Sequence, residues 1–143
     1  MIMVRFKDTF RERLPEWISS ITLLMWGLMV LFEPATLWHR DFFEAMATIA
    51  SQTIWGLVAT TVAIVKLLSL TVNGAWRPTA HFRAIGAFSS IMIWATLLIS
   101  FVALTWNPPT IALIAGVLLT DLFALWFAAG DAKLADVRAR ELK

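Results

Sequence analysis

One ionisable side chain interrupts a long apolar run and is the first candidate for chemistry. Asp121 lies in Ile114–Gly130, IAGVLLTDLFALWFAAG, which is otherwise almost wholly apolar. A carboxylate at the centre of a membrane span costs about 2.5–3.5 kcal/mol on insertion scales, so it must face protein or water rather than lipid. Three roles are open to Asp121: a packing partner of other polar groups, a protonatable or substrate-binding group in a transport path, or a group lining an aqueous lesion or pore.

An earlier apolar segment offers candidate partners for Asp121. Its small and polar residues share one helical face, which consists of Gln52, Gly56, Ala59, Ala63 and Lys66. Lys66 lies near the end of this segment, so its ammonium group either reaches back toward Asp121 or extends to the lipid headgroups. Gln52 is a further polar candidate for a functional role inside the membrane.

A later apolar segment carries the hydroxyl side chains of Ser89, Ser90, Thr96 and Ser100. These groups could line a path through the membrane. Hydroxyl groups inside a helix more often donate to a backbone carbonyl of the preceding turn. We therefore expect their own helix to satisfy them.

Enzyme chemistry finds little support in the sequence. The chain has no cysteine, which removes thiolate nucleophiles and thiolate metal ligands. Its two histidines, His39 and His81, are expected on opposite sides of the membrane, where they cannot share one metal or haem. The sequence contains no glycine-rich phosphate loop or nucleophile elbow. We expect no catalytic residue, no bound cofactor and no metal site.

The composition indicates that the candidate residues lie in a membrane. The chain of 143 residues is 59% hydrophobic and 15% charged, and its mean hydropathy is +0.75. Soluble domains are about 45–50% apolar and about 25% charged. The predicted fold class is all-α, a polytopic membrane protein with four transmembrane helices over residues 17–129. The spans are predicted at about 17–32, 45–70, 84–106 and 110–129. Crossing a bilayer takes roughly 20 residues, so the first span is short unless residues 14–16 extend it, and the second is long enough to tilt or to project beyond the hydrocarbon.

Turn signals and basic residues predict how the spans are connected and oriented. Turns are expected at Thr71–Thr79, where Asn-Gly is the signal, and at Trp106–Thr110, where two prolines end the preceding helix. Eleven of the twelve Lys and Arg residues fall near the two termini or near the connection between the second and third spans, and only Arg40 falls on the opposite side. By the positive-inside rule, both termini are cytoplasmic.

The segments outside the spans are short. Residues 1–16 are predicted to form an amphipathic helix on the membrane surface, because their apolar residues recur at helical spacing. The apolar stripe consists of Met3, Phe6, Phe10, Leu14 and Trp17. Pro15 then fits the first turn of the first span. Residues 130–143 are predicted to be a charged cytoplasmic tail.

Small residues predict where helices meet. On the fourth span they recur at every fourth position, and this ridge consists of Ala112, Gly116, Thr120, Ala124 and Ala128. Because lipid provides no hydrophobic drive between helices, such ridges associate by close packing. We expect self-association through the ridge, with Gly56 as a further packing position. The similar stretches MWGLMV (Met25–Val30) and IWGLVA (Ile54–Ala59) are interpreted as coincidence in a Trp-rich sequence.

Several short motifs carry a resemblance to known proteins. They are RLPEW (Arg13–Trp17), a WG in each of the first two spans, NGAWRPTAHFR (Asn73–Arg83) and a tryptophan in the third span. This pattern, over most of the chain, resembles small membrane proteins encoded by tailed bacteriophages, which are loosely grouped with holins. The resemblance implies a phage or prophage origin and residence in the inner membrane of the host. It implies no catalytic residue.

Three functions follow as hypotheses. The first is a holin-like subunit that oligomerises and opens a lesion in the membrane. The second is a non-enzymatic interaction subunit in genome entry, superinfection exclusion or a host membrane complex. The third is a small four-span exchanger. The expected partners are the lipid bilayer and either further copies of the chain or another membrane protein. Nucleic acid is not expected, because the net charge is only +2.

Overall fold

The computed structural model describes residues 13–33, 43–75, 80–104 and 106–141. Within these ranges the chain forms helices and no β-strand, which confirms the predicted all-α fold class. The helices are α2 (Leu14–Phe32), α3 (Glu44–Ile49), α4 (Gln52–Ala75), α5 (Ala80–Leu104) and α6 (Pro108–Glu141). The predicted surface helix over residues 1–16 lies outside the described residues, apart from its last few positions.

Four of the described helices are long and apolar enough to cross a membrane, over Leu14–Phe32, Gln52–Val72, Ala80–Leu104 and Pro108–Lys133. Their bounds differ from the predicted spans. The second span begins at Gln52 rather than at 45, because the extended residue Ala50 (φ −157°, ψ 161°) separates α3 from α4. The last helix continues past 129 to Glu141, so most of the predicted tail is helical.

The two ends of α2 have local causes. Pro15 lies in the first turn, where its missing N–H leaves no hydrogen bond unmade. Glu16 also lies in this turn, where the helix dipole favours a carboxylate. After Phe32 the chain is extended at Glu33 (φ −73°, ψ 142°), the conformation favoured before a proline. The prediction that Pro15 lies in the first turn of the first span is confirmed.

The two predicted turns differ from the observed connections. Pro108 and Pro109 lie in the first turn of α6 rather than between the helices, and Asn107 O accepts the N–H of Ile111 at 2.9 Å. Trp106, just before them, has a positive φ of 41°. The Asn73-Gly74 pair does not form a turn, because α4 continues to Ala75.

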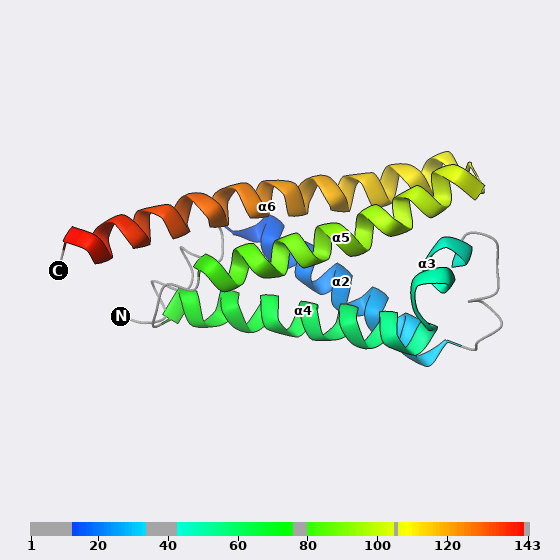
Figure 1. The fold of residues 1–143 in the computed structure, drawn as a ribbon, viewed down its shortest axis with the longest axis horizontal. Coiled ribbons are helices and arrows are strands. Elements are labelled where there is room, and N and C mark those ends of the chain that lie inside the picture. The colour runs from blue at the N-terminus through cyan, green and yellow to red at the C-terminus, as the bar shows by residue number, and fades with distance from the viewer. Residues whose placement is uncertain (1–12, 34–42, 76–79, 105, 142–143) are drawn as a thin grey trace.

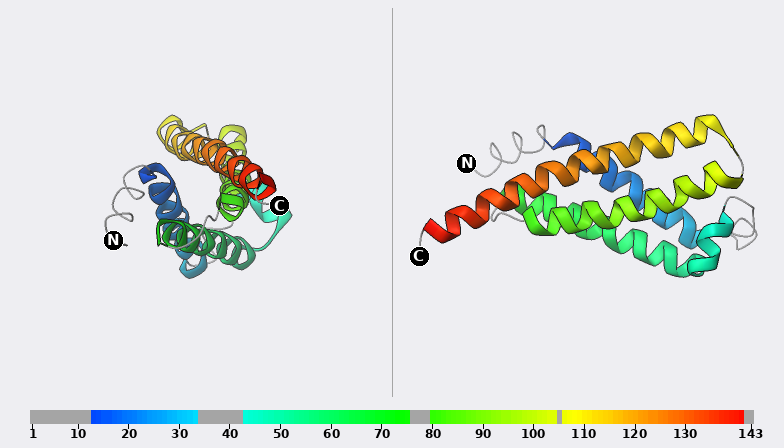
Figure 2. Two further views of the ribbon diagram at one scale, coloured as in Figure 1. Left: turned by 90° about the vertical axis from the view of Figure 1, so that its left-hand side faces the viewer. Right: turned by 45° about the horizontal axis from the view of Figure 1, so that its top comes forward.

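The long helices pack as two antiparallel hairpins. α2 pairs with α4, α5 pairs with α6, and the hairpins meet chiefly through α4 and α5, whereas α2 and α6 touch much less. Figure 1 shows that α2 begins and α6 ends at one end of the bundle, here called the termini end, with α3 at the other, the α3 end. The hairpins diverge toward the α3 end, where α3 packs against α5 (Figures 1 and 2).

Two glycines allow α2 and α4 to approach closely. A Cβ atom at Gly27 would lie 2.7 Å from the backbone N of Thr60, and a Cβ atom at Gly56 would lie 2.6 Å from Leu31 Cγ. The contacts are reciprocal, since each glycine faces the residue four positions after the other glycine. The two WG stretches, interpreted from the sequence as coincidence, therefore share one packing role.

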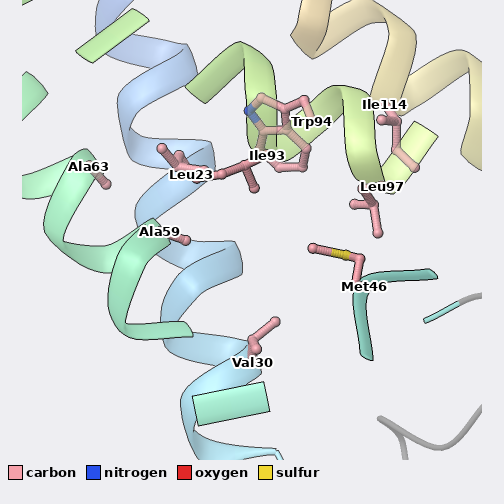
Figure 3. Close-up of a cluster of buried hydrophobic side chains, with 9 residues drawn as sticks. All are labelled: Leu23, Val30, Met46, Ala59, Ala63, Ile93, Trp94, Leu97 and Ile114. Atoms are coloured by element: carbon pink, nitrogen blue, oxygen red, sulfur yellow. The ribbon is translucent and has the colours of Figure 1, made fainter. Parts of the chain in front are cut away.

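Unlike a soluble protein, the bundle exposes many large apolar side chains and buries several charged ones. Its apolar core consists of Leu23, Val30, Met46, Ala59, Ala63, Ile93, Trp94, Leu97 and Ile114 (Figure 3). Large apolar side chains nevertheless cover the exterior, where Phe32, Leu113 and Trp126 are 83%, 72% and 78% exposed. Lys66, Arg83 and Asp121 are buried instead. An apolar exterior of this extent suits contact with lipid. These are the features of a multi-pass membrane protein.

Candidate functional site: ion pairs inside the bundle

A buried ion pair joins the two hairpins near the centre of the bundle. Lys66 Nζ of α4 lies 2.5 Å from Asp121 Oδ1 of α6, and the two side chains are 4% and 0% exposed. The Lys66 side chain therefore points into the bundle rather than toward lipid headgroups. The lysine and the carboxylate that the sequence places within the spans are direct partners.

Two serines complete the hydrogen bonding of this pair. Ser19 of α2 donates to Asp121 Oδ1, and Ser90 of α5 donates to Asp121 Oδ2. Lys66 Nζ also donates to Ser19 Oγ at 2.8 Å. Each of the long helices thus contributes one side chain to a single point. We call Ser19, Lys66, Ser90 and Asp121 the central cluster.

The energetics of burial explain why the central cluster must be complete. Removing one partner of a buried ion pair typically costs about 3–5 kcal/mol, because the other charge is left without compensation. Replacing both partners with apolar residues is often neutral. The Lys66–Asp121 pair therefore favours the observed arrangement of the helices, because an arrangement that keeps both charges buried but apart leaves each without a partner.

A second ionic cluster lies beside the first, toward the termini end. Arg83 of α5 binds Glu16 of α2 through two hydrogen bonds, Nε to Oε2 at 2.9 Å and Nη2 to Oε1 at 2.5 Å. Its Nη1 lies 2.8 Å from Asp131 Oδ2 of α6, and Arg13 Nη2 lies 3.1 Å from the same oxygen. Arg83 is 2% exposed and Asp131 is 41% exposed, so the cluster extends from the core to the surface. We call Arg13, Glu16, Arg83 and Asp131 the Arg83 cluster.

Helical spacing brings these side chains to the inside of the bundle. Arg83 and Ser90 are seven residues apart on α5, which places them two turns apart on one face. The same face of α5 buries Ala87, Trp94 and Leu97. Glu16, Ser19 and Leu23 recur at spacings of three and four on α2 and are buried likewise. On both helices, one inward face changes from charged to hydroxyl to apolar residues along its length.

The central cluster marks the boundary between two different halves of the bundle. One turn from it toward the α3 end, the inward positions are the apolar residues Leu23, Ala63 and Trp94. Toward the termini end, the inward positions include the charged residues Glu16 and Arg83. The core therefore has an ionic half at the termini end and an apolar half at the α3 end.

The remaining polar candidates have separate roles. Gln52 Nε2 donates to Val30 O at 2.7 Å and to Glu33 O at 2.8 Å, so it satisfies carbonyls at the end of α2 and does not join the central cluster. Three hydroxyls of α5 donate to carbonyls of their own helix, as expected: Ser89, Thr96 and Ser100. Ser90 is the exception, because it donates to Asp121 instead.

The small-residue ridge of α6 lies in two environments. Ala124 and Ala128 are buried in the bundle, Ala112 and Gly116 are exposed, and Thr120 is intermediate. The exposed part forms one wall of an open groove of about 380 Å³ between α2 and α6, whose lining includes Ile18, Ser19, Thr22, Leu113 and Val117. A Cβ atom at Gly116 would meet no other atom within 4 Å. This part of α6 is therefore open to a further molecule.

Five members of the two clusters are not among the candidate residues that the sequence suggests: Arg13, Glu16, Ser19, Arg83 and Asp131. Charged residues are common at the ends of membrane spans, where they face water. The position of Glu16 in the sequence therefore does not indicate that it is buried. Arg83 was assigned to a connection because the third span was predicted to begin at 84, whereas α5 begins at Ala80. The seven-residue spacing between Arg83 and Ser90 was the available signal that both face the core.

The ionic clusters join helices, and they do not form a metal centre. Among the residues that the structure describes, no group of three or more His, Cys, Asp or Glu side chains could hold a metal ion. In comparisons with protein-family models, curated proteins and solved structures, none matches this chain. Its function is therefore argued from the geometry of the bundle and from the motifs of the sequence.

Proposed function

We propose that this chain is a self-associating subunit of a bacterial inner membrane, encoded by a phage or prophage, whose assemblies open the membrane as holins do. The four long apolar helices and the apolar exterior support residence in a membrane as a multi-pass protein. The phage origin rests on the sequence motifs RLPEW and NGAWRPTAHFR. The distribution of basic residues supports cytoplasmic termini.

The observation that carries the proposal is the open groove between α2 and α6. Membrane helices associate through close packing and polar contacts rather than through hydrophobic burial. Ala112 and Gly116 expose a small-residue surface in the groove, and Thr22 adds a hydroxyl to the opposite wall. Ala124 and Ala128 already pack inside the protomer, so the groove is where the small-residue ridge remains open to a second copy.

The exchanger hypothesis has less support from the geometry. An exchanger needs a carboxylate that protons or substrate can reach. Asp121 is 0% exposed and accepts hydrogen bonds from Lys66, Ser19 and Ser90. The layer toward the α3 end is apolar. The interaction-subunit hypothesis uses the same groove as the holin hypothesis. It differs because assembly through the groove then leaves the membrane intact.

Induced lysis tests the proposal. The chain is expressed in bacteria together with a cytoplasmic endolysin that lacks an export signal. We expect delayed, abrupt lysis from the unmodified chain and delayed or absent lysis from Gly116→Leu, which fills the groove. Gly130→Leu is the matched control, because a Cβ atom at Gly130 on the same helix also meets no atom within 4 Å but lies outside the groove.

Membrane potential and protein level are measured in the same cultures. Continued growth with an intact potential, at verified membrane levels of the protein, would reject the lesion-forming function and favour the interaction subunit. Loss of potential without release of the endolysin would indicate a small pore instead. If Gly116→Leu and Gly130→Leu delay lysis to the same extent, the subunits do not assemble through the groove.

A further inference from the structure

The two hairpins are joined by different kinds of contact in the two halves of the bundle. In the ionic half, salt bridges connect α2 and α4 to α5 and α6 through Lys66–Asp121, Glu16–Arg83 and Arg13–Asp131. In the apolar half, the hairpins meet through side chains of the hydrophobic core, shown in Figure 3. Trp26 of α2 and Trp94 of α5 also contact there, with ring centroids 5.7 Å apart.

A bilayer affects these two kinds of contact in opposite ways. Lipid chains are as apolar as leucine, so parting two apolar helix surfaces exchanges contacts with side chains for contacts with lipid. Parting a buried salt bridge leaves two charges without partners in a medium that solvates them poorly. In a membrane, the hairpins therefore separate more readily at the α3 end than at the termini end.

The shape of the bundle agrees with this asymmetry. The hairpins diverge toward the α3 end (Figure 1). The groove between α2 and α6 reaches the central cluster at Ser19 and extends from there along α6 to Ala112, the fifth residue of that helix. The two hairpins thus already lie partly apart along this seam, on the apolar side of the central cluster.

We propose that the bundle works as a jaw, in which the hairpins part at the α3 end and turn on the ionic clusters, which stay closed. The central cluster is the pivot. Going from the termini end toward the α3 end, it is the last set of polar contacts that joins the two hairpins before the apolar half begins. Opening widens the groove between α2 and α6 and brings residues of the apolar core to its surface. The proposal requires four helices in a bilayer and does not depend on lesion formation.

Distances between spin labels in lipid vesicles test this motion. The chain contains no cysteine, so pairs of Cys substitutions can be labelled without background. One pair across the seam lies in the apolar half, at Met29 and Leu113, and a second lies in the ionic half, at Ile18 and Phe127; all four side chains are exposed. We expect a broad distribution with a longer-distance component for the first pair and a single narrow distribution for the second.

Pairs within one hairpin provide the control for label mobility. Met29 with Val58 spans α2 and α4, Leu113 with Val102 spans α5 and α6, and each pair reuses a label position from the apolar half. Both distributions should be narrow. Equally narrow distributions for the Met29–Leu113 and Ile18–Phe127 pairs would overturn the jaw, and so would a broad distribution in the ionic half of the unmodified protein.

The role of the central cluster as pivot is tested with Lys66→Met, which removes one charge of the pair. The Ile18–Phe127 distribution should then gain longer distances, while the pairs within each hairpin stay narrow. Ser90→Ala is a milder change that removes one hydrogen bond to Asp121 and keeps the ion pair, so it should leave the Ile18–Phe127 distribution narrow. An unchanged distribution in Lys66→Met, with narrow controls, would show that the hairpins do not turn on this cluster.

Discussion

Gly86 of α5 lies against the side chain of Lys66, and a Cβ atom at position 86 would lie 2.6 Å from Lys66 Cγ. Because Cγ is close to the backbone, the lysine cannot avoid this contact by moving only its ammonium end. We expect Gly86→Ala to displace Lys66 from Asp121 and to lower the free energy of unfolding by about 1–3 kcal/mol, the usual cost of overpacking. Titration with a denaturing detergent in mixed micelles measures this change.

Gly116→Ala and Gly130→Ala are the matched controls for this prediction. A Cβ atom at either position on α6 meets no atom within 4 Å. Alanine stabilises a helix interior by roughly 0.5–1 kcal/mol relative to glycine, so both variants should unfold at equal or higher detergent fractions than the unmodified chain. If Gly86→Ala unfolds at the same detergent fraction as the two control variants, Lys66 does not need the space at position 86.

The contact between α2 and α4 gives a second prediction. A Cβ atom at Gly27 would lie 2.7 Å from a backbone atom of Thr60, whereas at Gly56 it would lie closest to side-chain atoms of Leu31. The contact with the Thr60 backbone can be relieved only if α2 and α4 move apart, whereas Leu31 can relieve its contact by changing its rotamer. Gly27→Ala should therefore lower the free energy of unfolding more than Gly56→Ala. The reverse order in the same detergent titration would contradict the close backbone approach at Gly27.

The orientation of the spans gives a third prediction, which uses the absence of cysteine. Single Cys substitutions are introduced at Thr36, Asn107 and Leu142 and treated with a membrane-impermeant maleimide in intact spheroplasts. Positions 36 and 107 should be labelled, and position 142 should react only after the membrane is permeabilised, because basic residues concentrate on the cytoplasmic side. Labelling of position 142 in sealed cells would contradict cytoplasmic termini.

The spans could be predicted from the sequence because hydropathy depends only on composition along the chain. Their bounds could not. No proline or glycine marks the break at Ala50, and the carbonyl of Ser51, just before α4, accepts the N–H of Trp55. In the opposite sense, Asn73-Gly74 is a strong turn signal that α4 overrides. In both cases the local signal, or its absence, misplaces the end of a helix, and ends are the part of a helix that a sequence defines least well.

The candidate site was predictable to the extent that a buried charge requires a partner. Asp121 and Lys66 are the charged groups within the predicted spans, so the sequence leaves Lys66 either to pair with Asp121 or to extend to the lipid headgroups. The Arg83 cluster was not predictable in the same way, because Glu16 and Asp131 lie near span ends, where charged residues are ordinarily solvated. Their place in the cluster follows from how α2, α5 and α6 meet, and the spacing of residues along a single sequence does not reveal that arrangement.

The central claim is that Lys66 and Asp121 form one buried unit that fixes how the hairpins meet, and a double-mutant cycle tests it most directly. Lys66→Met and Asp121→Leu should each lower the free energy of unfolding by about 3–5 kcal/mol, because each leaves an unpaired buried charge. The double variant should recover most of that loss, since it leaves neither charge. The measurement is unfolding in mixed micelles at matched lipid composition. If the losses of the single variants simply add in the double variant, Lys66 and Asp121 do not act as a pair.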